Sequence, residues 1–187
     1  MPCTLNLVTF LKLAAMIAVY ILVGILLLAL IIALLSPPRY QIERTIIINK
    51  PKTYVMGRVA DFNHYKEWNP WQQMEPSAQA VITGTAKRPG HKYEWNGKKI
   101  GAGSLTLRDI DQKHIHFDLV FLRPWKSKAA DNWLFEEWGA DGTKVTWQNA
   151  GNLPFPMARL MWPMIRKNLD QQFIKGLNNL KLLSEGK

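Results

Sequence analysis

Cysteine is almost absent from this sequence of 187 residues, since the one thiol, Cys3, lies near the amino end. A single cysteine excludes a disulfide within the chain and a zinc site built on cysteine ligands. Acylation of Cys3 beside a membrane is one interpretation of its position, and an unmodified thiol is the simpler one.

The sequence also lacks the motifs of common enzymes and metalloproteins. It contains no glycine-rich phosphate loop, no nucleophile elbow and no metal-binding motif. His114 and His116 share one face of an expected strand, but two ligands without a third do not make a metal site. We therefore expect no catalytic residue, no metal ion and no cofactor.

Acidic side chains on the expected strands are the remaining candidates for proton transfer. They are Glu94, Asp118, Asp131, Glu136 and Glu137. One of them turned inward could act as a proton shuttle. Because alternate residues of a strand point to opposite faces, we expect most of these carboxylates to lie opposite the aromatic side chains.

A long apolar run near the start is the strongest feature that is present. Residues 13–35 carry no charged side chain, and fifteen of these twenty-three residues are Leu, Ile or Val. A helix of this length covers about 34 Å, which is enough to cross a hydrocarbon core of about 30 Å. The run ends at Ser36-Pro37-Pro38 without a small-residue cleavage pattern, which favours a retained membrane helix over a cleaved signal peptide.

The charge distribution bears on the side of the membrane and on partners. More basic residues follow the run than precede it, which favours a cytoplasmic carboxyl-terminal part, although folded domains of this size can be translocated regardless of charge. The formal net charge is +10, and a basic domain at a membrane would be attracted to anionic lipid headgroups. Lys and Arg are scattered in ones and twos, so we expect no nucleic-acid binding.

The chain divides into a short leader (1–12), a single membrane-spanning helix (13–35), a linker (36–39) and one domain (40–187). Alternating and β-branched segments within the domain predict seven strands. These are residues 40–48, 78–84, 91–96, 100–110, 114–122, 129–138 and 143–150. Short connections between consecutive strands, with a type I′ turn expected at Asn96-Gly97, indicate an antiparallel meander.

The last part of the domain changes from strand to helix periodicity. From Met157 to Leu180, apolar residues recur every three or four positions, which predicts one amphipathic helix of about 25 residues. Its apolar stripe must pack on the sheet. Phe155, Trp162 and Pro163 stand at the entry to this helix, either at a cavity mouth, at the membrane interface, or as a hydrophobic staple.

Several segments resemble one known superfamily. The stretch 61–71, DFNHYKEWNPW, is similar to the start of SRPBCC proteins, the START and pollen-allergen-like helix-grip proteins. Further matching segments are YEWNG (93–97), IGAGSL (100–105), GTKVTW (142–147), GNLPFP (151–156) and KGLNNLK (175–181). The resemblance covers residues 40–183, and it is strongest to the bacterial polyketide cyclase/dehydrase-like group, some members of which carry a membrane anchor.

This resemblance implies an α+β helix-grip fold, preceded here by one transmembrane helix. A curved antiparallel sheet would wrap around the long carboxyl-terminal helix and leave an apolar cavity between them. The resemblance transfers no catalytic residue, because the superfamily includes lipid carriers, cyclases and chaperone activators.

Aromatic residues and methionines are the candidates for the cavity wall. We expect the wall to be formed by Trp68, Trp95, Phe121, Trp133, Trp147, Met161, Met164 and Phe173. The alternative is that these residues fill a solid core.

The sequence therefore predicts a single-pass cell-membrane protein whose domain binds a hydrophobic, lipid- or polyketide-like small molecule. Two alternatives remain: a cyclase/dehydrase-type enzyme acting in the same cavity, and a chaperone-regulating or interaction module.

Overall fold

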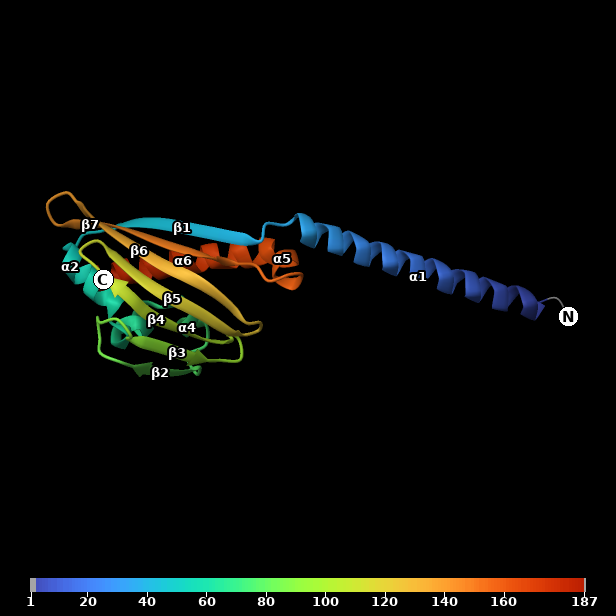
Figure 1. Ribbon diagram of the computed structural model, residues 1–187, viewed down its shortest axis with the longest axis horizontal. Helices are drawn as coiled ribbons and strands as arrows, with labels where there is room; N and C mark the ends of the chain where they lie inside the picture. Colours follow the sequence, from blue (N-terminus) through green and yellow to red (C-terminus); the bar gives the residue numbers. More distant parts are fainter. Residues whose placement is uncertain (1–2, 187) are drawn as a thin grey trace.

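The computed structural model describes residues 3–186 and shows a mixed α+β domain with one helix projecting from it (Figure 1). The projecting helix, α1 (Cys3–Leu35), contains the whole apolar run and begins ten residues before it. Its segment Val8–Leu35 is long and apolar enough to cross a membrane. Most of its large side chains are exposed, so α1 is not a core helix of the domain.

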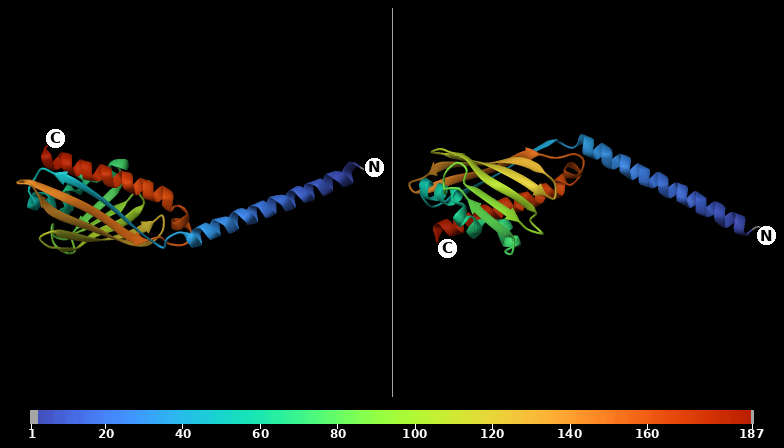
Figure 2. Two further views of the ribbon diagram at one scale, coloured as in Figure 1. Left: turned by 90° about the horizontal axis from the view of Figure 1, so that it is seen from above. Right: turned by 60° about the horizontal axis from the view of Figure 1, so that its bottom comes forward.

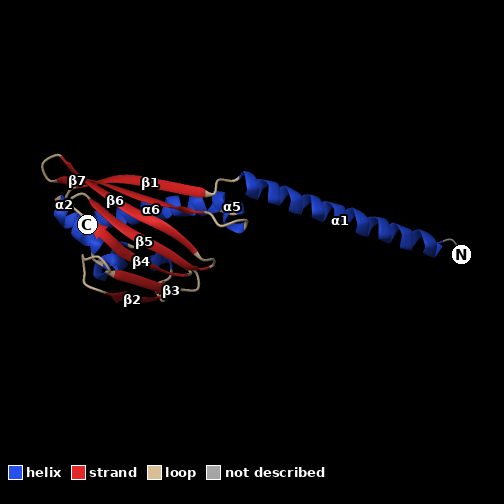
Figure 3. Ribbon diagram, in the orientation of Figure 1, coloured by secondary structure: helices blue, strands red, loops and turns tan. Residues whose placement is uncertain are grey.

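The domain is built on one antiparallel sheet of seven strands (Figure 3). The strands are β1 (Arg39–Ile48), β2 (Gln79–Thr83), β3 (Lys92–Asn96), β4 (Ala102–Ile110), β5 (His114–Arg123), β6 (Ser127–Trp138) and β7 (Gly142–Asn152). Their order in the sheet is β1-β7-β6-β5-β4-β3-β2, so β2 to β7 form the predicted meander and β1 pairs with the last strand. The predicted helix-grip architecture is confirmed.

Short helices fill the connection between β1 and β2. They are α2 (Lys52–Ala60), η1 (Phe62–His64), α3 (Tyr65–Trp68) and α4 (Pro70–Met74). Polar side chains cap two of them, η1 and α4. Asp61 accepts from the Asn63 backbone N–H at 3.0 Å, and Asn69 accepts from that of Trp71 at 2.9 Å. Pro70 occupies the first turn of α4, where a missing N–H is tolerated.

The carboxyl-terminal segment forms two helices where the sequence predicted one. These are α5 (Met157–Leu160) and α6 (Trp162–Glu185). Pro163 explains the break, because it has no N–H to donate to the carbonyl four residues before it. The long helix α6 lies along the concave side of the sheet (Figure 2).

Aromatic stacking joins α6 to the sheet. The ring of Trp147 on β7 lies 4.5 Å from that of Trp133 on β6 and 4.1 Å from that of Phe173 on α6, and both pairs are stacked. All three side chains are buried. Burying an aromatic side chain of this size contributes on the order of 3 kcal/mol, so this stack is a major part of the interface between α6 and the sheet.

The connection between β3 and β4 differs from the predicted tight turn. Neither Asn96 nor Gly97 has a positive φ, so the expected type I′ turn is wrong. The carboxylate of Glu75 instead accepts backbone N–H groups from Lys98, Lys99 and Ile100 at 2.8 to 3.1 Å. This side chain, 23 to 25 residues away from these donors in the sequence, organises a longer loop that a local turn signal could not indicate.

The end of α1 is fixed to the domain beside α5. The Leu153 N–H donates to the Pro38 carbonyl at 2.8 Å, and the Arg159 guanidinium donates to the Ala33 carbonyl at 3.4 Å. Ala33 is fully buried by this contact. One end of the sheet therefore lies next to the carboxyl end of α1 (Figure 1).

Candidate functional site

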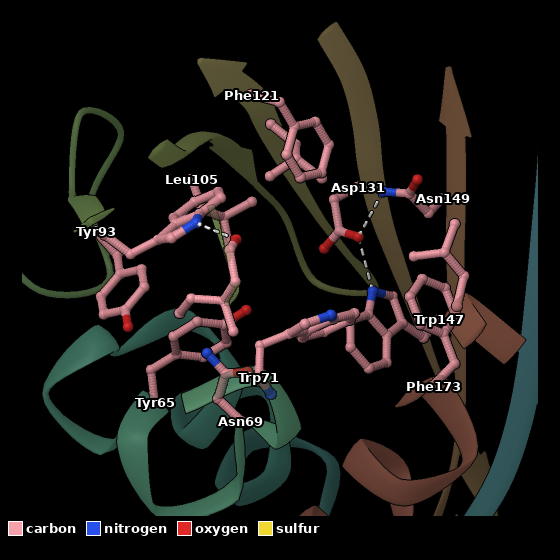
Figure 4. Close-up of a pocket in the computed structure, with 14 residues that line it drawn as sticks. Tyr65, Asn69, Trp71, Tyr93, Leu105, Phe121, Asp131, Trp147, Asn149 and Phe173 are labelled. Atoms are coloured by element: carbon pink, nitrogen blue, oxygen red, sulfur yellow. Dashed lines mark hydrogen bonds between the residues drawn. The ribbon is translucent and has the colours of Figure 1, made fainter. Parts of the chain in front are cut away.

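A cavity of about 120 Å³ lies between the sheet, α6 and the short helices (Figure 4). Seven of its lining side chains are aromatic, four are aliphatic and three are polar. The aromatic ones are Tyr65, Trp71, Tyr93, Trp95, Phe121, Trp147 and Phe173, and the aliphatic ones are Ile100, Leu105, Leu119 and Leu169. The polar ones are Asn69, Asp131 and Asn149. The wall is thus apolar with a few polar groups, the usual character of a small-molecule site.

Asp131 is the only acidic residue among these lining side chains, and it is 4% exposed. Its Oδ1 accepts the indole N–H of Trp147 at 2.8 Å and the amide N–H of Asn149 at 3.0 Å. Its Oδ2 accepts the indole N–H of Trp133 at 3.0 Å. Two of the tryptophans predicted to line the cavity therefore also position a carboxylate in it.

The amide of Asn149 is itself oriented by a tyrosine. The Tyr40 hydroxyl on β1 donates to Asn149 Oδ1 at 2.7 Å, which leaves the amide N–H group of Asn149 to face Asp131. This contact links three strands, β1, β7 and β6, behind the carboxylate. Partners of this kind hold a functional group in one orientation.

Burial raises the pKa of Asp131 above its ordinary value to about 6. The three N–H donors favour the ionised form and oppose that shift, so the effect of burial exceeds theirs. The carboxylate is therefore ionised at neutral pH and takes up a proton in mildly acidic conditions. A carboxyl group that titrates near pH 6 inside a cavity is suited to proton transfer.

Tyr65 lies across the cavity from Asp131 (Figure 4). Burial, and then the negative charge of Asp131, raise the pKa of Tyr65 well above its ordinary value, so its hydroxyl stays protonated. Within residues 3–186 no hydrogen bond of this hydroxyl is recorded, whereas the Tyr93 hydroxyl donates to Gln72 Oε1 at 2.7 Å. Tyr65 can therefore donate to a bound molecule.

Solved structures share the overall fold of this domain at low sequence identity. A hypothetical protein from Helicobacter pylori superposes with a TM-score of 0.60 at 9% identity, over 78% of this chain and 88% of that one. The Zhui aromatase/cyclase from Streptomyces sp. R1128 gives a TM-score of 0.59 at 15% identity, over 79% and 94%. Ara h 8.0201 gives 0.56 at 10%, over 80% and 99%.

The domain has the SRPBCC-type helix-grip fold. Identities this low establish the fold alone. No protein-family model and no curated protein matches the sequence.

The helix-grip domain brings together half of the residues predicted for the cavity wall. Trp95, Phe121, Trp147 and Phe173 line the cavity. Trp68 and Trp133 are buried but lie outside the lining, packed with their rings 5.7 Å apart. Whether the four lining residues contact a ligand stays a prediction.

The two methionines on the last helix are not part of the cavity lining, so their assignment to it was wrong. Met164 is 62% exposed and Met161 is half-buried. Met164 precedes Phe173 by nine residues, which at about 100° per residue puts the two side chains on opposite faces of α6. Leu169, four residues before Phe173, faces the cavity instead.

The polar groups of the site could have been found from strand alternation. Asp131 is two residues before Trp133 on β6, and Asn149 is two residues after Trp147 on β7, so each shares the inward face of its tryptophan. The expectation that strand carboxylates lie opposite the aromatics is wrong for Asp131. Tyr65 and Trp71 carried no comparable signal, because they come from short helices.

Metal ligands do not gather in the described part of the helix-grip domain. Residues 3–186 contain no group of three or more His, Cys, Asp or Glu side chains able to hold a metal ion. The His114 ring contacts Asp111, and the His116 ring pairs with the Asn132 side chain at 2.7 Å.

Replacing the cavity carboxylate should change how stability depends on pH. The Asp131 carboxyl ionises near pH 4 when unfolded and about two units higher when folded, so raising the pH through this window destabilises the wild type. Asp131→Asn removes this loss. We expect the unfolding free energy of Asp131→Asn minus that of wild type to increase by about 2 kcal/mol between about pH 4.5 and about pH 7.5. Any difference in stability that is independent of pH adds equally at both pH values and does not affect this change.

Chemical denaturation of the full chain at both pH values measures this change. Asp118→Asn, which alters an exposed carboxylate of β5, is the matched control. A difference between Asp131→Asn and wild type that does not vary with pH would contradict the assignment.

Proposed function

We propose that the helix-grip domain binds a small, flat, mostly apolar molecule that carries one hydrogen-bond donor directed at Asp131. The observation that carries this proposal is a single buried carboxylate in an otherwise aromatic and aliphatic cavity. The apolar wall would bind the body of the ligand by burial, and the carboxylate would select its orientation.

The volume of the cavity favours a compact ligand. About 120 Å³ is close to the size of an apolar protein cavity that accepts benzene, and it is below the range of drug-sized sites. A whole long-chain lipid would require the walls to move apart. The structural likeness to an aromatase/cyclase also supports an aromatic, polyketide-like ligand over an acyl chain.

The hydrogen bonds of Asp131 favour a ligand with one donor. A carboxylate has about four acceptor positions, and three are already occupied by Trp133, Trp147 and Asn149. One position remains, on Oδ2. A phenolic or enolic hydroxyl would fill it with a charge-assisted hydrogen bond.

A cavity-filling substitution tests the binding site with 2-naphthol, a bicyclic phenol, as the probe. Saturating 2-naphthol should raise the melting temperature of the full chain in detergent, because a ligand that binds only the native state stabilises it. Leu169→Trp places extra ring atoms in the cavity and should abolish the rise. Met164→Trp makes a similar change on the exposed face of the same helix and should preserve it.

A second arm uses 2-methoxynaphthalene, which has the same rings without the hydroxyl donor. A hydrogen bond to a charged group contributes about 1.5–3 kcal/mol, so the methyl ether should bind about tenfold more weakly or worse. If 2-naphthol changed the melting temperatures of Leu169→Trp and Met164→Trp equally, it would not be binding in the cavity.

We also propose that α1 is a retained membrane anchor. The length and composition of Val8–Leu35 support this, and so does the contact of its last turn with Arg159 of the folded domain, which a cleaved signal peptide would not need. Alkaline extraction should leave the full chain in the membrane pellet, with a mass that includes α1. Release of a shorter chain that lacks α1 would identify a signal sequence.

A catalytic role in the same cavity is the second candidate, and the pairing of Asp131 with Tyr65 favours it. An aspartate base opposite a protonated tyrosine can remove a proton next to a ketone and stabilise the enolate oxygen. Asp131 would take the proton from carbon, and Tyr65 would donate a hydrogen bond to the enolate oxygen. The carboxyl of Asp131 would exchange its proton with solvent, and the carbon would then regain a proton or deuteron from it.

Deuterium exchange of 2-tetralone, a bicyclic ketone of similar size, tests this role without a known substrate. The full chain should accelerate exchange at the carbon next to the carbonyl, with a rate that rises as the pH passes about 6. Asp131→Asn should abolish the acceleration, and Tyr65→Phe should reduce it by about 10²-fold, the usual cost of one oxyanion donor. Exchange no faster than in buffer would leave binding as the only function.

A further inference from the structure

We propose that the end of the domain next to α1 docks on an anionic bilayer surface and holds the mouth of the cavity at the lipid interface. This inference rests on the proposed anchoring by α1, and it names the surface of the domain that meets the lipid.

Strand pairing brings four connections to this end of the sheet. Arg39 pairs with Asn152, Phe121 pairs with Ser127, and Ala102 pairs with both Arg123 and Asn96. Segments 36–39, 97–101, 123–126 and 153–161 therefore meet at one end, the α1-side end. Figure 1 shows these connections on the side of the domain from which α1 projects.

The α1-side end carries mainly positive charge, with Glu75, which precedes β2, as an acidic residue beside it. Its four segments contain six basic residues and no acidic residue: Arg39, Lys98, Lys99, Arg123, Lys126 and Arg159. The strand connections at the opposite end, 49–51, 84–91, 111–113 and 139–141, contain four basic and two acidic residues. The positive charge of the domain is thus concentrated on the end that α1 would hold near the lipid headgroups. Charges attract anionic headgroups over about 10 Å at about 0.1 M salt, so proximity to the bilayer matters.

The domain neutralises the cations of the α1-side end only in part, through the Glu75 carboxylate that binds the loop of Lys98 and Lys99. Within residues 3–186, none of the six forms a salt bridge. Arg123 hydrogen-bonds to the Asn96 side chain, and Arg159 bonds to carbonyl groups. Toward the opposite end, Lys52 pairs with Glu137 at 3.2 Å and Lys144 with Glu136 at 3.0 Å.

Large apolar side chains accompany these cations. Leu122 is 54% exposed, Phe155 48% and Met157 55%. The Arg159 guanidinium lies 5.5 Å from the centre of the Phe155 ring, so a cation and an aromatic ring are presented together. Exposed apolar groups beside basic ones are the composition of surfaces that bind at a lipid interface.

The cavity reaches toward the same end. Among its lining residues, Trp95, Ile100 and Phe121 are partly exposed, and all three lie in or beside the connections of the α1-side end. The deeper lining residues Asp131, Trp147 and Phe173 are buried. A ligand that enters past Ile100 and Phe121 would therefore pass from the lipid interface to the carboxylate without crossing bulk water.

A fluorescent reporter on the full chain tests the docking. Cys3→Ser removes the native thiol, and Leu122→Cys carries an environment-sensitive dye next to segment 123–126, three strands away from β1 in the sheet order. Ala140→Cys, at the opposite end, is the matched reporter. The chains are reconstituted in phosphatidylcholine vesicles with or without phosphatidylglycerol and with nitroxide-labelled lipid as the quencher.

We expect the dye at position 122 to be quenched severalfold more in phosphatidylglycerol vesicles than in phosphatidylcholine vesicles, and the dye at position 140 to be unaffected. The double change Lys98→Glu and Lys126→Glu should abolish the extra quenching. Arg88→Glu with Lys113→Glu, an equal change of charge at the opposite end, should preserve it. Circular dichroism confirms that each variant is folded.

Equal quenching at positions 122 and 140, or equal effects of the two double variants, would overturn the docking. The 2-naphthol measurement in detergent separates this outcome from failure of the proposed function. Loss of docking with naphthol binding intact rejects the docking alone, and docking without naphthol binding rejects the ligand proposal alone.

Discussion

The packing of α6 against an aromatic concave sheet is the interaction on which this domain depends. Trp133, Trp147 and Phe173 form a continuous stack from β6 through β7 to the helix. A sheet with so large an apolar face cannot remain open to water, and α6 is the helix that lies along it. The close approach of Gly176, where an added Cβ would lie 3.0 Å from the Trp147 ring, shows how tightly helix and sheet fit at this point.

The cavity exists because this packing is tight at one end and incomplete at the other. Toward the far end, Phe117, Phe135 and Leu180 are fully buried and fill the space between sheet and helix. Toward α1, the indole N–H groups of Trp133 and Trp147 donate hydrogen bonds to Asp131. The carboxylate of Asp131 occupies a position where an apolar side chain would otherwise complete the core. Burying a carboxylate is costly even with three donors. A domain selected only for stability would gain by an apolar residue here, so the position of Asp131 indicates a function.

The sequence was sufficient for the architecture because periodicity is a local property. Alternation predicted the strands of the meander, and the spacing after Met157 predicted a terminal helix. The details that failed depend on other parts of the chain. Glu75 holds the β3–β4 loop from 23 to 25 residues away, Pro163 divides the helix, and rotation about α6 turns Met164 away from the cavity. Alternation also implies that Asp131 shares a face with Trp133, contrary to our expectation for the strand carboxylates, but it could not show whether packing would leave a space in front of Asp131.

The protonation state of Asp131 determines which ligands suit the cavity. When it is ionised, its one unoccupied position is an acceptor, so a hydroxyl-bearing ring is favoured. When it is protonated, Oδ2 carries a hydrogen, and the same position favours a carbonyl or ether oxygen. Because the pKa of this carboxyl is about 6, the slightly lower pH beside negative headgroups, which concentrate protons as well as cations, would increase the protonated fraction of Asp131. The charge of the bilayer would thus act on the domain twice: directly on the cations at the α1-side end, and through local acidity on the one carboxylate that lines the cavity.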